Sequence, residues 1–173
     1  MKIFKYIALV LVGLLIIFFS IGLFQPEISY TNKVIINADP HKVYTLFQDT
    51  TKMKEWMPGF NSFTSIKGKP ATVGSQWKLI LIQEGEKYEM NETLTIIKPD
   101  EQYSFILDNA VLSNNVDMYF KPVAGKTELT VENKVRGNNI MWRSLFYFFK
   151  GRLTEQSSMM YDGLKKMIEN TPG

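Results

Sequence analysis

Residues 34–60 read VIINADPHKVYTLFQDTTKMKEWMPGF, and this stretch contains the signals that decide the fold. The β-branched residues at its start predict a strand over residues 29–38. Asp39 and Pro40 follow, an N-cap residue and a first-turn proline, so a helix begins directly after the strand. Residues 51–56 predict a second short helix, which ends at Met57-Pro58-Gly59. We therefore expect one strand followed by two short helices.

Several further runs with the composition of strands follow this stretch, and short turn signals separate them. The runs cover residues 62–67, 75–83, 87–98, 102–109, 115–123 and 126–136. The turns contain glycine, proline or aspartate, as in Glu84-Gly85-Glu86 and Pro99-Asp100. Because the connections are so short, neighbouring strands must run antiparallel. With the first strand, this meander predicts a sheet of about seven strands.

One long helix is predicted from Asn139 to about Asn170, with a bend near Gly151. Its apolar residues recur at helical spacing. Its first part, MWRSLFYFF at residues 141–149, is apolar on more than one face, which is unusual for a solvated helix. Two interpretations stay open for this part. Either the sheet buries it, or its aromatic side chains lie at a membrane interface.

The segment from Tyr6 to Phe24 reads YIALVLVGLLIIFFSIGLF and contains no charged residue. As a helix it would be roughly 28 Å long, close to the thickness of the hydrocarbon core of a bilayer. Lys2 and Lys5 precede it, and Glu27 is the first charge after it. This distribution predicts a single-pass membrane anchor with a cytoplasmic N-terminus and the rest of the chain on the extracytoplasmic side, periplasmic or extracellular.

A cleaved signal peptide is the alternative interpretation of this segment. Ser20 and Gly22 are small and lie two residues apart, as in a cleavage site. The apolar run is nevertheless longer than the usual hydrophobic region of a signal peptide. We therefore expect residues 1–26 to form a transmembrane signal-anchor and residues 27–173 to form one domain, held close to the bilayer by a short connection.

The composition excludes several classes of site. The chain of 173 residues contains no cysteine and a single histidine, His41, so disulfides, thiolate nucleophiles and histidine metal clusters are excluded. We expect His41 to be solvated in the first turn of its helix. The net charge of +3 is too small for a nucleic-acid footprint. No catalytic constellation, metal spacing or phosphate loop is recognisable, so we expect no cofactor.

Three stretches of the sequence resemble the START-like superfamily, also called SRPBCC, which includes polyketide cyclases. They are VIINADPHKVYTLFQDTTKMKEWMPGF, VGSQWKLIL, and MNETLTIIKPDEQYSFIL followed by VDMYFKPVAGKTELTVENKVRG. The resemblance implies an α+β helix-grip fold, in which a curved antiparallel sheet of about seven strands wraps around the long C-terminal helix and leaves a cavity. As a guide to function it is weak, because this scaffold carries many activities.

Alternation along the strands indicates which residues face that implied cavity. Tyr88, Met90, Glu92, Leu94 and Ile96 share one face of their strand. The ligand-cavity candidates are Trp77, Tyr88, Met90, Glu92, Tyr103, Phe105, Asn133, Phe149 and Leu153. The cavity-mouth candidates are Trp56, Met57 and Phe60. The set mixes large apolar groups with a few polar ones, as in known small-molecule cavities.

Glu92 is the most informative of these candidates, because an unpaired buried carboxylate is costly. It is a polar anchor or acid in the cavity, or it forms a salt bridge with Lys78 or Arg152, or the register of its strand differs from the expected one. The other candidates are either pocket residues or ordinary core.

Three functions follow from these observations. The first is a membrane-anchored binding domain for a lipid or another hydrophobic small molecule, which acts just outside the membrane. The second is a polyketide cyclase-like enzyme in which Glu92 and a tyrosine act as acid and base. The third is a co-chaperone-like module for protein interaction, which predicts a filled core without a cavity. The identity of the ligand, or of a protein partner, does not follow from the sequence.

Overall fold

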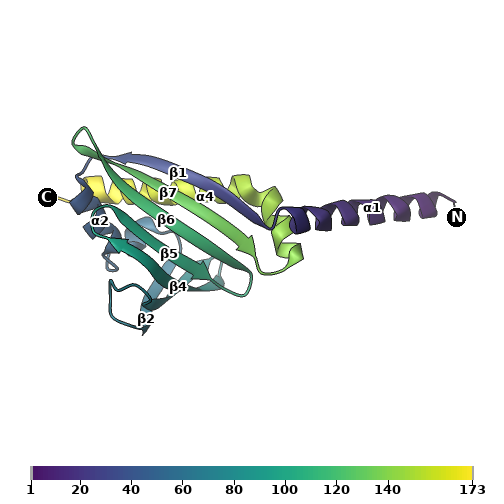
Figure 1. The fold of residues 1–173 in the computed structure, drawn as a ribbon, viewed down its shortest axis with the longest axis horizontal. Coiled ribbons are helices and arrows are strands. Elements are labelled where there is room, and N and C mark those ends of the chain that lie inside the picture. The colour runs from purple at the N-terminus through teal and green to yellow at the C-terminus, as the bar shows by residue number, and fades with distance from the viewer. Residues whose placement is uncertain (1, 173) are drawn as a thin grey trace.

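The computed structural model describes residues 2–172 and contains one sheet, one long helix along it, and one helix that leaves the domain (Figure 1). In chain order, the elements are α1 (Lys2–Phe24), β1 (Glu27–Ile36), α2 (Pro40–Gln48), α3 (Met53–Trp56), β2 (Phe60–Lys67), β3 (Gln76–Gln83), β4 (Glu86–Lys98), β5 (Gln102–Asp108), β6 (Leu112–Val123), β7 (Lys126–Gly137) and α4 (Ile140–Asn170).

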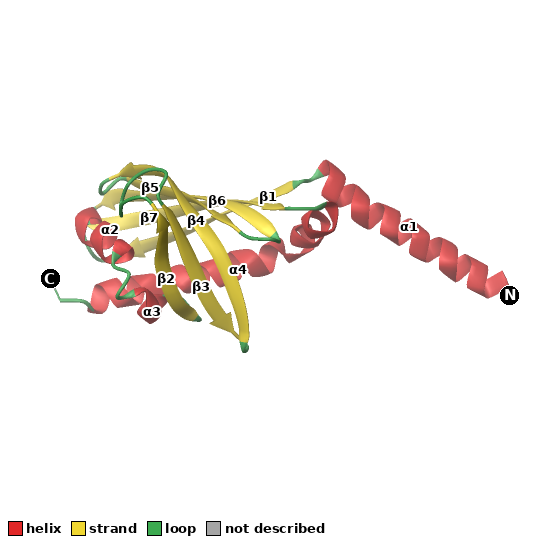
Figure 2. Cartoon of the chain, turned by 90° about the horizontal axis from the view of Figure 1, so that it is seen from below, coloured by secondary structure: helices red, strands yellow, loops and turns green. Residues whose placement is uncertain are grey.

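The seven strands form a single antiparallel sheet in the order β1-β7-β6-β5-β4-β3-β2. Strands β2 to β7 are a meander, and β1 closes the far edge beside β7. The sheet curves around α4, which lies along one of its faces (Figure 2). The predicted α+β helix-grip architecture is therefore confirmed, with every expected strand and helix present.

Two strands differ locally from the sequence prediction. Strand β6 begins at Leu112, so that Asn114 belongs to the strand. In β4, the pairing with β5 shifts between Leu94 and Ile96. This bulge reverses the expected alternation, because an extra residue turns the following side chains over. Ile97, and not Ile96, consequently packs against the core.

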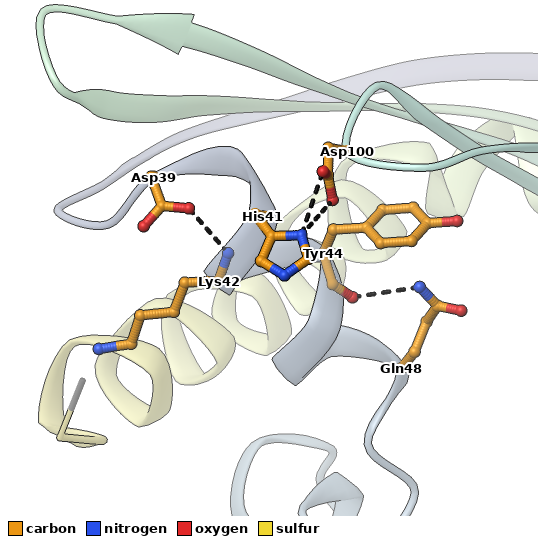
Figure 3. Close-up of polar contacts among 6 residues, drawn as sticks. All are labelled: Asp39, His41, Lys42, Tyr44, Gln48 and Asp100. Carbon is orange, nitrogen blue, oxygen red and sulfur yellow. Dashed lines mark hydrogen bonds and ion pairs between the residues drawn. The ribbon is translucent and has the colours of Figure 1, made fainter.

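The start of α2 forms as its sequence predicts (Figure 3). The Asp39 side chain accepts a hydrogen bond of 3.0 Å from the backbone N–H of Lys42 and caps the helix. The exposed His41 contacts Asp100 with its Nδ1 atom, 3.1 Å from each carboxylate oxygen. This contact joins α2 to the turn between β4 and β5.

The filled part of the core lies at the C-terminal half of α4. Leu164 and Ile168 are fully buried there, and Val43 and Phe47 of α2 cover the same region. Phe47 also packs edge-on against Tyr103 of β5, with ring centroids 5.3 Å apart. The side chains of α2 and α3 thus fill this end of the space between sheet and helix.

Helix α1 is almost entirely exposed and extends away from the domain (Figures 1 and 2). Residues Ile3–Phe24 are long and apolar enough to cross a membrane, by length and composition. The C-terminal end of α1 packs against the start of α4. The backbone N–H of Gly22 donates to Ser144 Oγ at 3.1 Å, and Phe18 stacks on Phe148 with ring centroids 6.1 Å apart.

Candidate functional site

A cavity of about 240 Å³ lies between the sheet and the middle of α4. It is partly open, and helices α2 and α3 close one end of it. Its lining is mainly large and apolar. The apolar lining residues are Phe47, Met53, Trp56, Met57, Pro58, Phe63, Leu79, Leu81, Met90, Phe105, Leu107, Val116, Met118, Leu153 and Met160. Apolar walls of this kind with a few polar groups are typical of small-molecule sites.

Among the described residues, Glu92 carries the one carboxyl group that lines the cavity, and it is only 7% exposed. In the part of the chain that the structure describes, it forms no ion pair. Lys78 pairs with Glu89 instead, at 3.6 Å. Burial raises the pKa of Glu92 to about 7, and the Tyr103 hydroxyl beside it lowers this pKa somewhat. Glu92 therefore exchanges its proton near neutral pH.

Two asparagine side chains from neighbouring strands form a second polar group in the lining. Asn114 Nδ2 of β6 donates to Asn133 Oδ1 of β7 at 3.0 Å. The other two amide atoms, Asn133 Nδ2 and Asn114 Oδ1, are buried and have no hydrogen-bond partner among the described residues. Such groups are costly to leave unpaired. The pair therefore has one amide nitrogen and one amide oxygen without a partner.

Two tyrosines lie near the asparagine pair, and Gln83, Gln156 and Ser157 also belong to the polar lining. Tyr30 of β1 pairs in register with Asn133, and Tyr161 lies on α4. Burial raises the pKa of Tyr30 to about 12 and raises the pKa of Tyr161 as well. Both hydroxyls consequently stay protonated at neutral pH and can donate hydrogen bonds.

Seven of the residues that the sequence indicates lie in the cavity wall. The five ligand-cavity candidates among them are Met90, Glu92, Phe105, Asn133 and Leu153, and the two mouth candidates are Trp56 and Met57. They come from α3, the adjoining loop, three different strands (β4, β5 and β7) and α4, and the fold brings them together. Their contact with a ligand stays a prediction.

Three predicted residues of the sheet do not line the cavity, although each lies on a strand that does. Trp77 turns toward β2, where it stacks on Phe63 at 5.0 Å. Tyr88 lies near the turn of the β3–β4 hairpin and is 47% exposed. Tyr103 packs against Phe47 in the filled part of the core and reaches the site only through Glu92.

The remaining two predicted residues lie outside the wall because they are on parts of α4 and β2 that do not reach the cavity. Phe149 is on the first turns of α4, which pack against α1, and its side chain is 41% exposed. Phe60 packs against the core at the start of β2 and is half-buried. Helical spacing could not reveal the position of Phe149, because the apolar spacing along α4 continues past the point where the sheet ends.

Asn114 and Tyr30 are among the polar wall residues that the sequence pattern did not indicate. The predicted strand began one residue after Asn114, so this residue was assigned to no face. Alternation with Val116 and Met118 would have placed it on the inner face. Tyr30 was hidden because β1 mixes polar and apolar residues on both faces.

The residues that line the cavity are suited to ligand binding, and Glu92 can exchange a proton. Their arrangement does not match an established catalytic constellation. Within residues 2–172, no group of three histidine, aspartate or glutamate side chains could hold a metal ion. The interpretation as a protein-interaction module expected a filled core. The structure differs, since it contains a cavity of about 240 Å³.

Comparison with known proteins places the chain in a broad structural group. A family model described as polyketide cyclase/dehydrase and lipid transport matches residues 27–170. No curated protein matches the sequence.

Solved structures share the fold at low sequence identity. Ara h 8.0201 has a TM-score of 0.67 at 10% identity, over 84% of this chain and 99% of that one. The di-domain aromatase/cyclase BexL of the BE-7585A biosynthetic pathway has a TM-score of 0.68 at 16% identity, over 86% of this chain and 52% of that one. Norcoclaurine synthase from Thalictrum flavum, solved in complex with dopamine and hydroxybenzaldehyde, has a TM-score of 0.63 at 10% identity, over 85% of this chain and 90% of that one.

Proposed function

The chain belongs to the polyketide cyclase/dehydrase and lipid transport family, and we propose that it is a membrane-anchored protein that binds a lipid or another hydrophobic small molecule. The observation that carries this proposal is the apolar cavity between the sheet and α4. Protein interiors are normally packed without large voids, so a space of about 240 Å³ indicates a site for a ligand.

The membrane part of the proposal is supported by how α1 is attached. Only Gln25 and Pro26 separate α1 from β1. The Gly22–Ser144 hydrogen bond and the stack of Phe18 on Phe148 dock the helix on the domain. A segment removed as a signal peptide would have no need of such packing, so these contacts favour an anchor that stays attached.

The first turns of α4 support the same arrangement. Tyr147, Phe148 and Phe149 are exposed around the end of α1. We name Ile140, Met141, Tyr147, Phe148 and Phe149 the aromatic collar. Exposed aromatic and apolar side chains are favourable at the headgroup level of a bilayer. The collar continues the apolar surface of α1, and the proposed occupant of this surface is the membrane itself.

The proposal is tested by identifying what co-purifies with the full-length protein. Leu153→Trp adds a large side chain to the cavity wall on α4, and Met159→Trp makes the same change at an exposed position of that helix. Protein in nanodiscs would be extracted and the extract analysed by mass spectrometry. We expect one hydrophobic compound enriched in the wild type and in Met159→Trp, and depleted in Leu153→Trp. Equal extracts from all three proteins would refute ligand binding in the cavity.

A second candidate function is a cyclase-like reaction, and the Glu92–Tyr103 contact favours it. A buried carboxyl group with a pKa of about 7 is suited to proton transfer near neutral pH. In that case the compound that co-purifies would be converted by the wild type, and Glu92→Gln would abolish turnover while the compound still binds. Unchanged turnover in Glu92→Gln would refute this role.

A further inference from the structure

The charged groups of the cavity wall restrict the charge of the ligands that can bind. No lysine or arginine is among the residues that line the cavity in the described chain. Its ionisable groups are Glu92 on β4, Tyr30 on β1 and Tyr161 on α4, with Tyr103 of β5 behind Glu92. A ligand with a negative group would therefore lose its hydration without gaining a counter-charge, and would also face a carboxylate.

The asparagine pair favours a ligand with an uncharged polar group. One hydrogen bond joins Asn114 and Asn133, and it uses one donor and one acceptor of the pair. If both amides were turned over, the bond would run in the other direction and would again leave one donor and one acceptor free. A hydroxyl group both accepts and donates, so it can satisfy both of them.

The Glu92 carboxyl group and the asparagine pair are well separated, and Gln83, Gln156 and Ser157 are uncharged polar residues elsewhere in the lining. Glu92 pairs in register with Leu107 of β5, and Leu107 pairs with Asn114 of β6. One strand thus lies between the carboxyl group and the amide pair, which places them roughly 10 Å apart across the sheet. The apolar side chain of Leu107 lies in the wall between them.

We infer that the cavity selects an uncharged hydrophobic molecule that carries a hydroxyl group, which binds the Asn114–Asn133 pair, while Glu92 disfavours anionic ligands. This inference rests on the proposed function and specifies its ligand class. It predicts discrimination between an alcohol and the carboxylate with the same chain.

Methionine methyl groups allow binding to be measured in the full-length protein. Five methionines line the cavity, namely Met53, Met57, Met90, Met118 and Met160. Met141 and Met159 are exposed and serve as internal controls. Protein labelled at the methionine methyls would be placed in nanodiscs and titrated with octane, octanol or octanoate. Each variant is compared with the wild type for the same probe, so partition of the probe into the bilayer cancels.

The asparagine pair is tested with Asn114→Leu/Asn133→Leu, because leucine has the branching and the number of heavy atoms of asparagine but no polar atom. We expect this variant to bind octanol about tenfold more weakly, because the hydrogen bonds of the hydroxyl are lost. Octane should bind as well as before or better. If the double variant does not fold, the single variants Asn114→Leu and Asn133→Leu give the same comparison.

The carboxyl group is tested independently with Glu92→Gln at about pH 8, where Glu92 is largely ionised. We expect octanoate to bind about tenfold more tightly to this variant, since a like charge at that separation is removed. Octanol affinity should change less than about twofold.

The outcomes separate this inference from the function on which it rests. If no probe shifts the cavity methyls of the wild type, the proposed ligand cavity is wrong. If octane shifts them, but octanol and octanoate affinities are the same in wild type and variants, ligand binding stands and the selection of an uncharged hydroxyl compound is overturned.

Discussion

Glu92 shows how burial changes the free energy needed to ionise a side chain. Its carboxyl group lies in an apolar wall without a cation, and burial raises its pKa from the ordinary 4.5 to about 7. The folded state therefore holds this proton more tightly than the unfolded chain does. The resulting contribution of Glu92 to the free energy of unfolding is fully present below about pH 4.5 and is lost as the pH rises through about 7.

We predict that Glu92→Gln removes this pH dependence. The rise in pKa corresponds to about 3 kcal/mol of stability lost by the wild type between about pH 4 and pH 8. The glutamine variant should lose much less over the same range, because its side chain does not ionise. Urea unfolding of the full-length protein in detergent, followed by tryptophan fluorescence at several pH values, measures the difference.

The matched control for this prediction is Glu89→Gln on the same strand. Glu89 is exposed, and a hydrogen bond from Lys87 lowers its pKa, so its contribution to stability has the opposite sign and is small. This variant should keep the slope of the wild type. A wild-type stability that does not fall as the pH rises, or an equal fall in Glu92→Gln, would contradict a buried unpaired carboxyl group.

At the residue scale, the sequence predicted wall residues where the alternation along a strand is regular, and it did not predict how side chains pack. Glu92 and Asn133 were predicted in the wall because strand alternation is regular where they lie. The side-chain packing of Trp77 and Tyr103 was not predictable. It depends on neighbours that are distant in sequence, Phe63 and Phe47.

At the scale of elements, the junction of α1 and α4 depends on a close approach of two helices. A Cβ atom at Gly22 would collide with the carbonyl oxygen of Ile140 and with Ser144 Oγ. A Cβ at Gly13 would meet nothing within 4 Å. The two glycines of the same helix therefore give a test and its control.

We predict that Gly22→Leu separates the two helices and Gly13→Leu does not. The chain has no cysteine, so Phe18→Cys/Phe148→Cys introduces a single pair at positions whose rings now stack. In membranes, oxidation should link the two cysteines, and mass spectrometry of the alkylated protein measures the yield. Adding Gly22→Leu should reduce the yield several-fold, as expected when backbones cannot approach. The same yield in both leucine variants would contradict this packing.

We also predict that the aromatic collar lies in the bilayer interface. A spin label at Tyr147→Cys should be reached by oxygen more than by a water-soluble nickel complex, because oxygen concentrates in the membrane. A label at Met159→Cys, exposed further along α4, should show the reverse. Power-saturation measurements in nanodiscs give both accessibilities. A label at position 147 with the accessibility of position 159 would place the collar in water.

The elements themselves were largely predictable, since their signals are local. The Asp39-Pro40 start of α2 and the short turns of the meander needed no information from the rest of the chain. The bulge at Leu94 to Ile96 was not predictable, because it depends on how β4 pairs with β5. The neighbours of the first turns of α4 were left open for the same reason.

At the scale of the whole molecule, three regions follow one another along α4. Its first turns pack against α1, its middle lines the cavity, and its C-terminal half lies in the filled core. The core stabilises the sheet around α4, and this allows the middle of the helix to face an unfilled space. The cavity is thus held between the core and the proposed membrane attachment.

Membrane topology is the last consequence of this arrangement, and we predict a cytoplasmic N-terminus with the domain on the other side. Lys2 and Lys5 precede the apolar helix, and positively charged residues favour the cytoplasmic side. A single cysteine at Met159 should react with a membrane-impermeant maleimide in intact cells, while a cysteine at Lys5 should react only after the membrane is permeabilised. The mass of the labelled protein must be that of the uncleaved chain, because removal of α1 would release the domain from the membrane. Labelling of position 5 alone in intact cells would reverse the topology, and a mass that lacks the first residues would identify α1 as a signal peptide.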